Sequence, residues 1–286
     1  MANPTTAITT IPPAHAESEL IRSLCTSGGY RTPETGRRVG VSRLLGRWDG
    51  WVYWHAARVI IGGARASKQG RHDPARWRWE SEELIHVMEA AGGEVDITGM
   101  EETLKLEGPA VYISNHMSMI ETFFLPSILM ARGDISFILK QALLAYPFFG
   151  TLLKATHPIA VTRKDPRADL KFVLSRGIEL LKSGRSIAVF PQATRSPTFT
   201  PRQFNTLGVK LAERAGVPVV PIALKTDFMR VGKLVRDFGS LDRSLPIHFR
   251  FAPPIMPPFK SRDAHAIVVN FIRGSLNEWG GTIDEE

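Results

Sequence analysis

The sequence AVYISNHMSMIE, residues 110–121, decides the fold that we expect for this chain. A β-branched and aromatic run breaks into polar residues and then passes into the apolar segment 119–130, a pattern typical of a strand, a turn and a helix. His116 falls at the turn, and Glu121 follows five residues later. Five residues of regular helix rotate through about 500°, so the two side chains can meet only if His116 lies in the turn and Glu121 in the first turns of the helix.

A carboxylate beside a neutral imidazole would make His116 a general base near neutral pH. The alternative interpretation is a solvated histidine near a helix start, and the motif on its own leaves that open. The rest of the chain has to decide between a catalytic pair and a surface histidine.

Strand and helix signals alternate after residue 80. Strands are expected at 95–97, 110–113, 135–139, 158–162, 186–190, 217–224 and 247–251, and helices at 81–91, 119–130, 165–182, 205–215 and 263–279. This alternation favours an α/β fold with a mainly parallel central sheet flanked by helices. No repeat or linker interrupts it, so we predict one domain over residues 80–286, preceded by an N-terminal amphipathic helical extension.

Charge and cysteine content narrow the function. The chain has 286 residues and a net charge of +8, which favours anionic partners such as phosphates or an anionic membrane surface. Its single cysteine, Cys25, excludes an internal disulfide and a cysteine-based zinc site. The histidines lack the spacing of metal ligands, so we expect neither a metal nor another cofactor.

The first 79 residues differ in composition from the rest. Residues 1–40 are rich in Pro, Thr, Ser, Gly and Ala, which predicts a largely disordered arm. Residues 41–79 are basic and rich in tryptophan, which predicts an amphipathic helical segment in a membrane interface. One face of this segment is basic and holds Arg43, Arg47, Arg58 and Arg65. The opposite face is apolar and holds Leu45, Trp48, Val52, Ala56 and Val59. The alternative is a helix packed on the protein's own core. A nucleic-acid contact is a weaker third interpretation, and we expect no nucleic-acid partner because no recognised binding motif accompanies the charge.

No segment of the sequence has the roughly 18 uninterrupted apolar residues of a membrane span. The N-terminus also lacks the basic and apolar regions of a secretory signal peptide. We therefore expect a protein associated peripherally with the cytoplasmic face of a membrane.

Four polar segments share one topological position, immediately after the carboxyl end of an expected strand. They are His116, Lys140, Arg163 and the run Gln192-Ala193-Thr194-Arg195-Ser196. Ligands of open α/β sheets bind at this edge. One base and three cations at this edge predict a site, with a phosphate as the natural ligand of the cations.

The same residues resemble the sequence blocks of the glycerolipid acyltransferases, the lysophosphatidate acyltransferase group often called the PlsC family. Four blocks match in order, over roughly residues 95–225: Asn115-His116-x4-Glu121, His157 to Arg163, Phe190 to Ser196 and Val217 to Ile222. Lys140 and the segment 147–150 between the first two blocks also fit. The family pattern has Asp where this chain has Glu121, and Glu-Gly where it has Gln192 and Ala193.

The resemblance implies transfer of a fatty acyl group from acyl-CoA or acyl-carrier protein to a lysophospholipid hydroxyl. His116 would then be the general base, oriented by Glu121. The acceptor's phosphate would be bound by Lys140, Arg163, Thr194, Arg195 and Ser196. An acyl-chain groove formed by Phe123, Phe124, Phe148 and Phe149 is one interpretation, although each of these residues taken singly is better explained as an ordinary core residue.

Two other classes of function stay open from the sequence. One is a non-catalytic lipid-binding relative of the same fold, which the departures at Gln192 and Ala193 favour and the retained His116 disfavours. The other is a hydrolase that activates water on a thioester or lipid with the same pair. The chain has no Gly-x-Ser-x-Gly elbow, which disfavours a serine hydrolase.

Overall fold

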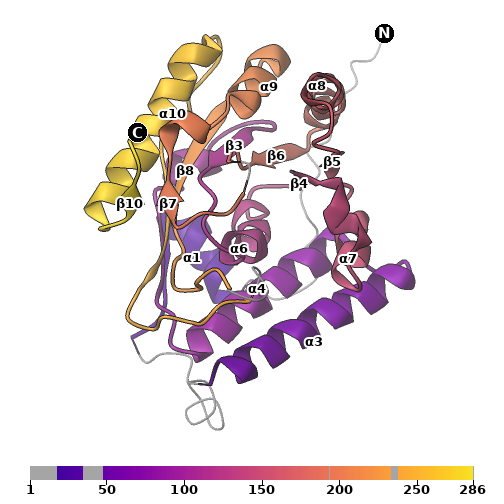
Figure 1. Ribbon diagram of the computed structural model, residues 1–286, viewed down its shortest axis with the longest axis vertical. Coiled ribbons are helices and arrows are strands. Elements are labelled where there is room, and N and C mark those ends of the chain that lie inside the picture. The colour runs from indigo at the N-terminus through magenta and orange to yellow at the C-terminus, as the bar shows by residue number, and fades with distance from the viewer. Residues whose placement is uncertain (1–17, 35–47, 193, 233–237, 286) are drawn as a thin grey trace.

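The computed structural model describes residues 18–34, 48–192, 194–232 and 238–285. A central sheet separates two layers of helices (Figure 1). Its strands, in chain order, are β1 (Tyr30–Arg31), β2 (Val95–Thr98), β3 (Val111–Ser114), β4 (Ile135–Lys140), β5 (Ile159–Val161), β6 (Ser186–Val189), β8 (Val219–Lys225) and β9 (Ile247–Phe251). A separate small sheet pairs β7 (Thr198–Phe199) with β10 (Thr282–Ile283) in parallel.

The spatial order of the large sheet is β1-β2-β9-β8-β3-β6-β4-β5. The five strands from β8 to β5 are mutually parallel. The chain reverses at β9, which pairs antiparallel with β8 and parallel with β2, and β1 closes that edge antiparallel to β2. The predicted α/β fold with a mainly parallel sheet flanked by helices is therefore confirmed, with an antiparallel edge that the sequence analysis did not anticipate.

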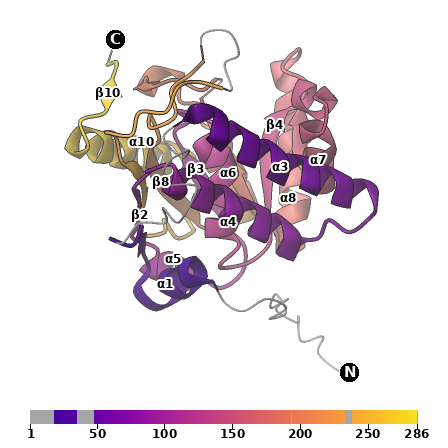
Figure 2. The ribbon, with the colours of Figure 1, turned by 90° about the horizontal axis from the view of Figure 1, so that it is seen from below.

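Nine α-helices are found in the described residues: α1 (Glu19–Ser27), α3 (Asp49–Lys68), α4 (Pro74–Ala90), α5 (Glu101–Leu104), α6 (Ile120–Leu129), α7 (Phe149–Ala155), α8 (Pro166–Lys182), α9 (Leu207–Ala215) and α10 (Ser261–Glu278). The described residues also contain two short 3₁₀-helices, η1 (Gln141–Ala145) before α7 and η2 (Pro201–Gln203) before α9. Figure 2 shows α3 on one side of the molecule, where it packs against α4 and α7.

The alternation of side chains along β3 explains the two layers, because successive residues of a strand point to opposite faces. Tyr112 packs into the core cluster that contains residues of α1, α4 and α6. Val111 and Ile113 pack into the second cluster, which contains residues of α8, α9 and α10. Every residue of β3 is buried, as expected of a strand covered on both faces.

The prediction of disorder across residues 1–40 is wrong for the part that the structure describes. Ser18 caps α1 by accepting a hydrogen bond from the backbone of Ile21, and Leu20 and Leu24 are buried in the first core cluster. The Tyr30 hydroxyl donates to Glu89 of α4 at 2.7 Å. A few apolar residues suffice here because they join a core that the rest of the chain provides. Residues 1–17 and 35–40 lie outside the described residues.

The helical segment expected at 41–79 also differs from the prediction. Arg43, Leu45 and Arg47 lie outside the described residues, and α3 begins at Asp49. Asp73 caps α4, which then runs without a break through the predicted domain boundary at residue 80. Helices α3 and α4 pack together, and α3 also packs on α7, so this segment is continuous with the domain.

Candidate functional site

Asn115 fixes the point at which the chain leaves β3. Its side chain is completely buried, donates to the backbone oxygen of Leu224 at 2.7 Å, and accepts from the Leu224 backbone nitrogen at 2.8 Å. The amide thus continues the β3–β8 pairing by one step through a side chain. The following residue, His116, is thereby directed out of the sheet into the turn before α6.

His116 and Glu121 form the pair that the spacing allowed. His116 Nδ1 lies 2.9 Å from Glu121 Oε1. The same oxygen accepts the backbone N–H groups of Met117 and Ser118, and Oε2 accepts the hydroxyls of Ser118 at 3.0 Å and Thr226 at 2.7 Å. The turn therefore folds around the carboxylate, which explains how five residues bring the two side chains together.

Glu121 is ionised in this setting although it is fully buried. Burial raises the pKa of Glu121, but the hydrogen bond and charge of His116 and the Thr226 hydroxyl outweigh burial and hold the pKa below its ordinary value. An ionised Glu121 accepts the proton on Nδ1, so it selects the tautomer whose lone pair is on Nε2.

Residues after β6 hold the imidazole and its backbone in place. The ring stacks on Phe190, with centroids 4.2 Å apart and 17° between the planes. Gln192 Oε1 accepts the His116 backbone N–H at 2.8 Å, and the Ser196 backbone N–H donates to the His116 backbone oxygen at 2.9 Å. The position of His116 is therefore set from β3, α6 and the β6 end together.

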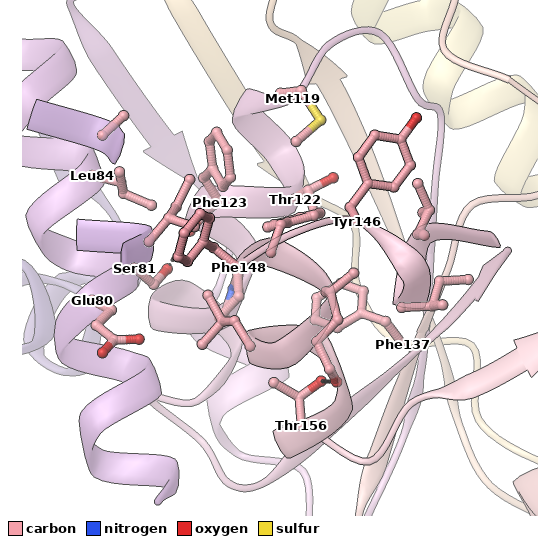
Figure 3. A pocket seen from close by; sticks show the side chains of 18 of the residues that line it. Glu80, Ser81, Leu84, Met119, Thr122, Phe123, Phe137, Tyr146, Phe148 and Thr156 are labelled. Atoms are coloured by element: carbon pink, nitrogen blue, oxygen red, sulfur yellow. Dashed lines mark hydrogen bonds between the residues drawn. The ribbon is translucent and has the colours of Figure 1, made fainter. Parts of the chain in front are cut away.

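A cavity of about 590 Å³ lies between the edge of the sheet and α3, and His116 is one of the residues that line it. The polar part of the lining contains His116, Lys140, Arg163, Gln192, Thr194 and Arg195. The apolar part comes from α3, α4, α6, η1 and α7 (Figure 3), and includes Ala56, Val59, Leu84, Met119, Phe123, Leu143, Phe148 and Phe149. The site thus joins a histidine and cations to a long apolar compartment.

Most of the predicted site residues line this cavity, and three do not: Phe124, Ser196, and Glu121, which lies behind His116. Phe124 is a core residue, because it is completely buried and stacks on Phe249 of β9 with centroids 5.9 Å apart. It is removed from the expected acyl groove, whereas Phe123, Phe148 and Phe149 line the cavity. Ser196 is not among the lining residues, and it contributes its backbone N–H to the His116 turn instead. Ala193 lies outside the described residues.

Three partners of the pair escaped the sequence analysis. Ser118 and Thr226 donate hydrogen bonds to Glu121, and Phe190 stacks on the imidazole of His116. Thr226 immediately follows β8, so the strand-end argument that found His116 and Lys140 could have found it. Within the described part of the chain, no group of three His, Cys, Asp or Glu side chains is arranged to hold a metal ion.

Comparisons with known proteins show similarity over the segment that contains His116 and Glu121. Residues 94–225 match the family model described as Acyltransferase. A 1-acyl-sn-glycerol-3-phosphate acyltransferase of Pseudomonas aeruginosa is 40% identical over 133 residues, covering 46% of this chain and 50% of the relative. A chloroplastic 1-acyl-sn-glycerol-3-phosphate acyltransferase of Arabidopsis thaliana is 33% identical over 142 residues, covering 50% of this chain and 38% of the relative. This chain therefore spans about half the length, or less, of these relatives.

The fold is also similar to that of a solved structure. The 1-acyl-sn-glycerophosphate acyltransferase PlsC of Thermotoga maritima superposes with a TM-score of 0.61, covering 83% of this chain and 96% of the other. The two sequences are 18% identical over that superposition, so the likeness concerns the fold.

Proposed function

We propose that this chain, whose residues 94–225 match the Acyltransferase family model, is a PlsC-like enzyme that transfers a fatty acyl group from a thioester to the free hydroxyl of a 1-acyl-sn-glycerol-3-phosphate. The observation that carries the proposal is the His116–Glu121 pair at the polar end of a largely apolar cavity. A base next to an apolar compartment suits a reaction in which both substrates carry acyl chains.

The geometry supports a direct transfer without an acyl-enzyme. Nε2 of His116 takes the proton of the acceptor hydroxyl as its oxygen attacks the thioester carbonyl carbon. The tetrahedral intermediate collapses with cleavage of the C–S bond, and the leaving thiolate recovers the proton from Nε2. Glu121 stabilises the imidazolium that exists between these two proton transfers.

The charges of the cavity support an anionic acceptor. Lys140, Arg163 and Arg195 line it together with Thr194, a set of donors suited to a phosphate. Glu80 is the sole carboxylate among the described residues of the lining, and its two oxygens bind Arg76 at 2.7 Å and His72 at 3.1 Å. A cationic head group would therefore lack a carboxylate partner, whereas a phosphate monoester would have several cations.

Gln192, which departs from the family pattern, is compatible with this mechanism. Its amide oxygen accepts the His116 backbone N–H, a role for which an amide oxygen serves as well as a carboxylate oxygen. The substitution removes one negative charge beside the proposed phosphate site. We therefore retain a phosphate-bearing acceptor as the proposal, with acyl-CoA or acyl-carrier protein as donor and no cofactor.

The experiment is an acyl-transfer assay with acyl-CoA and acyl-carrier protein as alternative donors and a panel of lysophospholipids as acceptors. His116→Ala is expected to lower kcat roughly 10²- to 10⁴-fold, because the hydroxyl loses its base. His248→Ala is the matched control, since His248 lies on β9 and contacts Asp96 and Trp279 outside the cavity.

Each failure of this assay has a distinct meaning. Unchanged transfer by His116→Ala would refute the mechanism. Binding of lysophospholipid without transfer by the wild type would favour the non-catalytic alternative. Release of free fatty acid without an acylated product would favour the hydrolase.

We also propose that the outer face of α3 contacts an anionic membrane surface. Trp54 is 63% exposed on this face, beside exposed Arg58 and Arg65, a composition suited to a lipid interface. No described helix combines the length and hydropathy required to cross a bilayer. The proposed membrane contact is therefore one of a helix lying on the surface.

This contact is tested by sedimentation with anionic and zwitterionic vesicles. Replacing Trp54 by Ser and Arg58 by Gln together is expected to weaken binding to anionic vesicles roughly tenfold. The matched control changes Lys210 and Arg214 of α9 to Gln, on the opposite layer of helices. Equal binding by both variants would exclude α3 as the contact.

A further inference from the structure

The turn after β5 carries an unusual backbone conformation at a residue of the proposed site. Arg163 has φ of 59°, in the left-handed region that residues with a Cβ seldom adopt. Its side chain lines the cavity that His116 enters. A side chain presented from a disfavoured backbone conformation requires contacts that hold that conformation.

Asp169, on the first turns of α8, supplies those contacts. Its Oδ2 accepts the Arg163 backbone N–H at 2.6 Å, and its Oδ1 accepts the Thr162 backbone N–H at 3.0 Å and the Thr162 hydroxyl at 3.1 Å. The Thr162 backbone N–H is the main cause, with that of Arg163, of a pKa of Asp169 below its ordinary value. The carboxylate is therefore ionised, and both of its oxygens bind the turn.

Asp169 is not needed to start the helix on which it lies. Asp165 performs that task, because its Oδ1 accepts the backbone N–H groups of Arg167 at 2.9 Å and Ala168 at 3.0 Å. Pro166 occupies the first helical position, where its missing N–H is without cost. Two aspartates four residues apart thus have separate partners, one in the helix and one in the preceding turn.

We propose that Asp169 is a positioning residue that locks the 162–163 turn so that Arg163 presents its guanidinium to the phosphate of the acceptor. The proposal rests on the proposed function for the identity of the ligand. Asp169 acts through Arg163 and stays outside the chemistry, so it should affect recognition of the phosphate and leave the acyl-transfer step unchanged.

The test compares Asp169→Ala with the matched control Asp165→Ala. Asp169→Ala is expected to raise KM for 1-acyl-sn-glycerol-3-phosphate about tenfold, the worth of one well-placed charge-assisted contact, with kcat within about twofold of the wild type. With 1-acylglycerol, which lacks the phosphate, its KM should equal that of the wild type. Asp165→Ala should lower Tm through loss of the cap and leave both KM values unchanged.

A double variant separates positioning from general destabilisation. In an Arg163→Ala background, Asp169→Ala should add no further increase in KM, because the residue that it positions is already gone. Equal KM changes in the Asp165 and Asp169 variants, additive effects of Asp169 and Arg163, or a loss confined to kcat would each overturn the proposal.

A direct binding measurement distinguishes this proposal from the proposed function. Calorimetric titration with monomeric 1-acyl-sn-glycerol-3-phosphate should give a Kd about tenfold higher for Asp169→Ala than for the wild type or Asp165→Ala. Absence of both transfer and binding in the wild type would overturn the proposed function. Normal wild-type behaviour with an unaltered Kd in Asp169→Ala would overturn the role of Asp169 alone.

Discussion

The turns after β3 and β5 are built in the same way and differ in what their carboxylates touch. Each turn precedes a helix, and a carboxylate in the first turns of that helix collects two consecutive backbone N–H groups. Glu121 is completely buried and also contacts the imidazole of His116. Asp169 is partly exposed, accepts hydrogen bonds from the backbone and hydroxyl of the turn, and interacts electrostatically with Arg163. The same arrangement of a helix carboxylate and two backbone N–H groups thus positions both the proposed base, His116, and a proposed phosphate-binding residue, Arg163.

Because Glu121 is buried and Asp169 is partly exposed, we expect substitutions of these two carboxylates to have effects of different size. A buried charge must be matched by partners, so removing Glu121 or its charge disturbs every group that faces it. Water can replace some of the hydrogen bonds that the partly exposed Asp169 makes to the turn. We therefore expect substitution of Glu121, after β3, to affect catalysis strongly, and substitution of Asp169, after β5, to affect recognition of the acceptor moderately.

The largest expected effect is that of Glu121→Gln on kcat. Gln preserves the shape of the side chain but removes the charge that orients and stabilises the imidazolium, so kcat should fall roughly 10²- to 10⁴-fold. The acyl-transfer assay with saturating acceptor measures it. Glu89→Gln is the matched control, a buried glutamate that binds Tyr30 and Thr32 away from the cavity.

Two other outcomes would contradict the expected difference between Glu121 and Asp169. A Glu121→Gln variant with wild-type kcat and a raised KM would make Glu121 a positioning residue of the same kind as Asp169. A Glu89→Gln variant with an equal loss of kcat would assign the effect to stability.

A smaller effect is expected on stability in acid. The pKa of Glu121 lies below its ordinary value of 4.5, so the folded state binds a proton less readily than the unfolded chain. The stabilisation by Glu121 is therefore complete above that ordinary value and is lost as the pH falls through the lower pKa of the folded state. Replacing it by Gln should flatten the decline of the free energy of unfolding between about pH 6 and pH 3.

Urea unfolding at a series of pH values measures this decline. Asp169→Asn should flatten it less, because Asp169 is partly exposed and its pKa shift has the same sign. Parallel curves for the wild type and Glu121→Gln would show that another group dominates the acid response.

The sequence was sufficient to locate the site because its signals are local. Lys140 is the last residue of β4, and His116 and Arg163 each lie two residues beyond a strand. Apolar runs ending in polar residues identify such positions without knowledge of the fold. The parallel order of the strands then brings them to one edge, as expected.

The remaining features depend on contacts between distant parts of the chain. Phe123 and Phe124 are adjacent in an apolar helix, and only the packing against Phe249 decides which one faces the core. No periodic pattern in the sequence between β8 and β9 indicates that β9 runs antiparallel to β8. Asp165 and Asp169 are equivalent as helix-start signals, so their different partners were visible only in three dimensions.

Part of the apolar wall of the cavity comes from a separate stretch of the chain. The residues around His116 lie within the family segment 94–225, whereas Tyr53, Ala56, Val59 and Leu84 of the facing wall precede it. Under the proposed function, mutations in the first hundred codons can change which lipid tails fit without altering the base that acts on them. Part of the substrate range can therefore change while the residues that carry out the reaction stay the same.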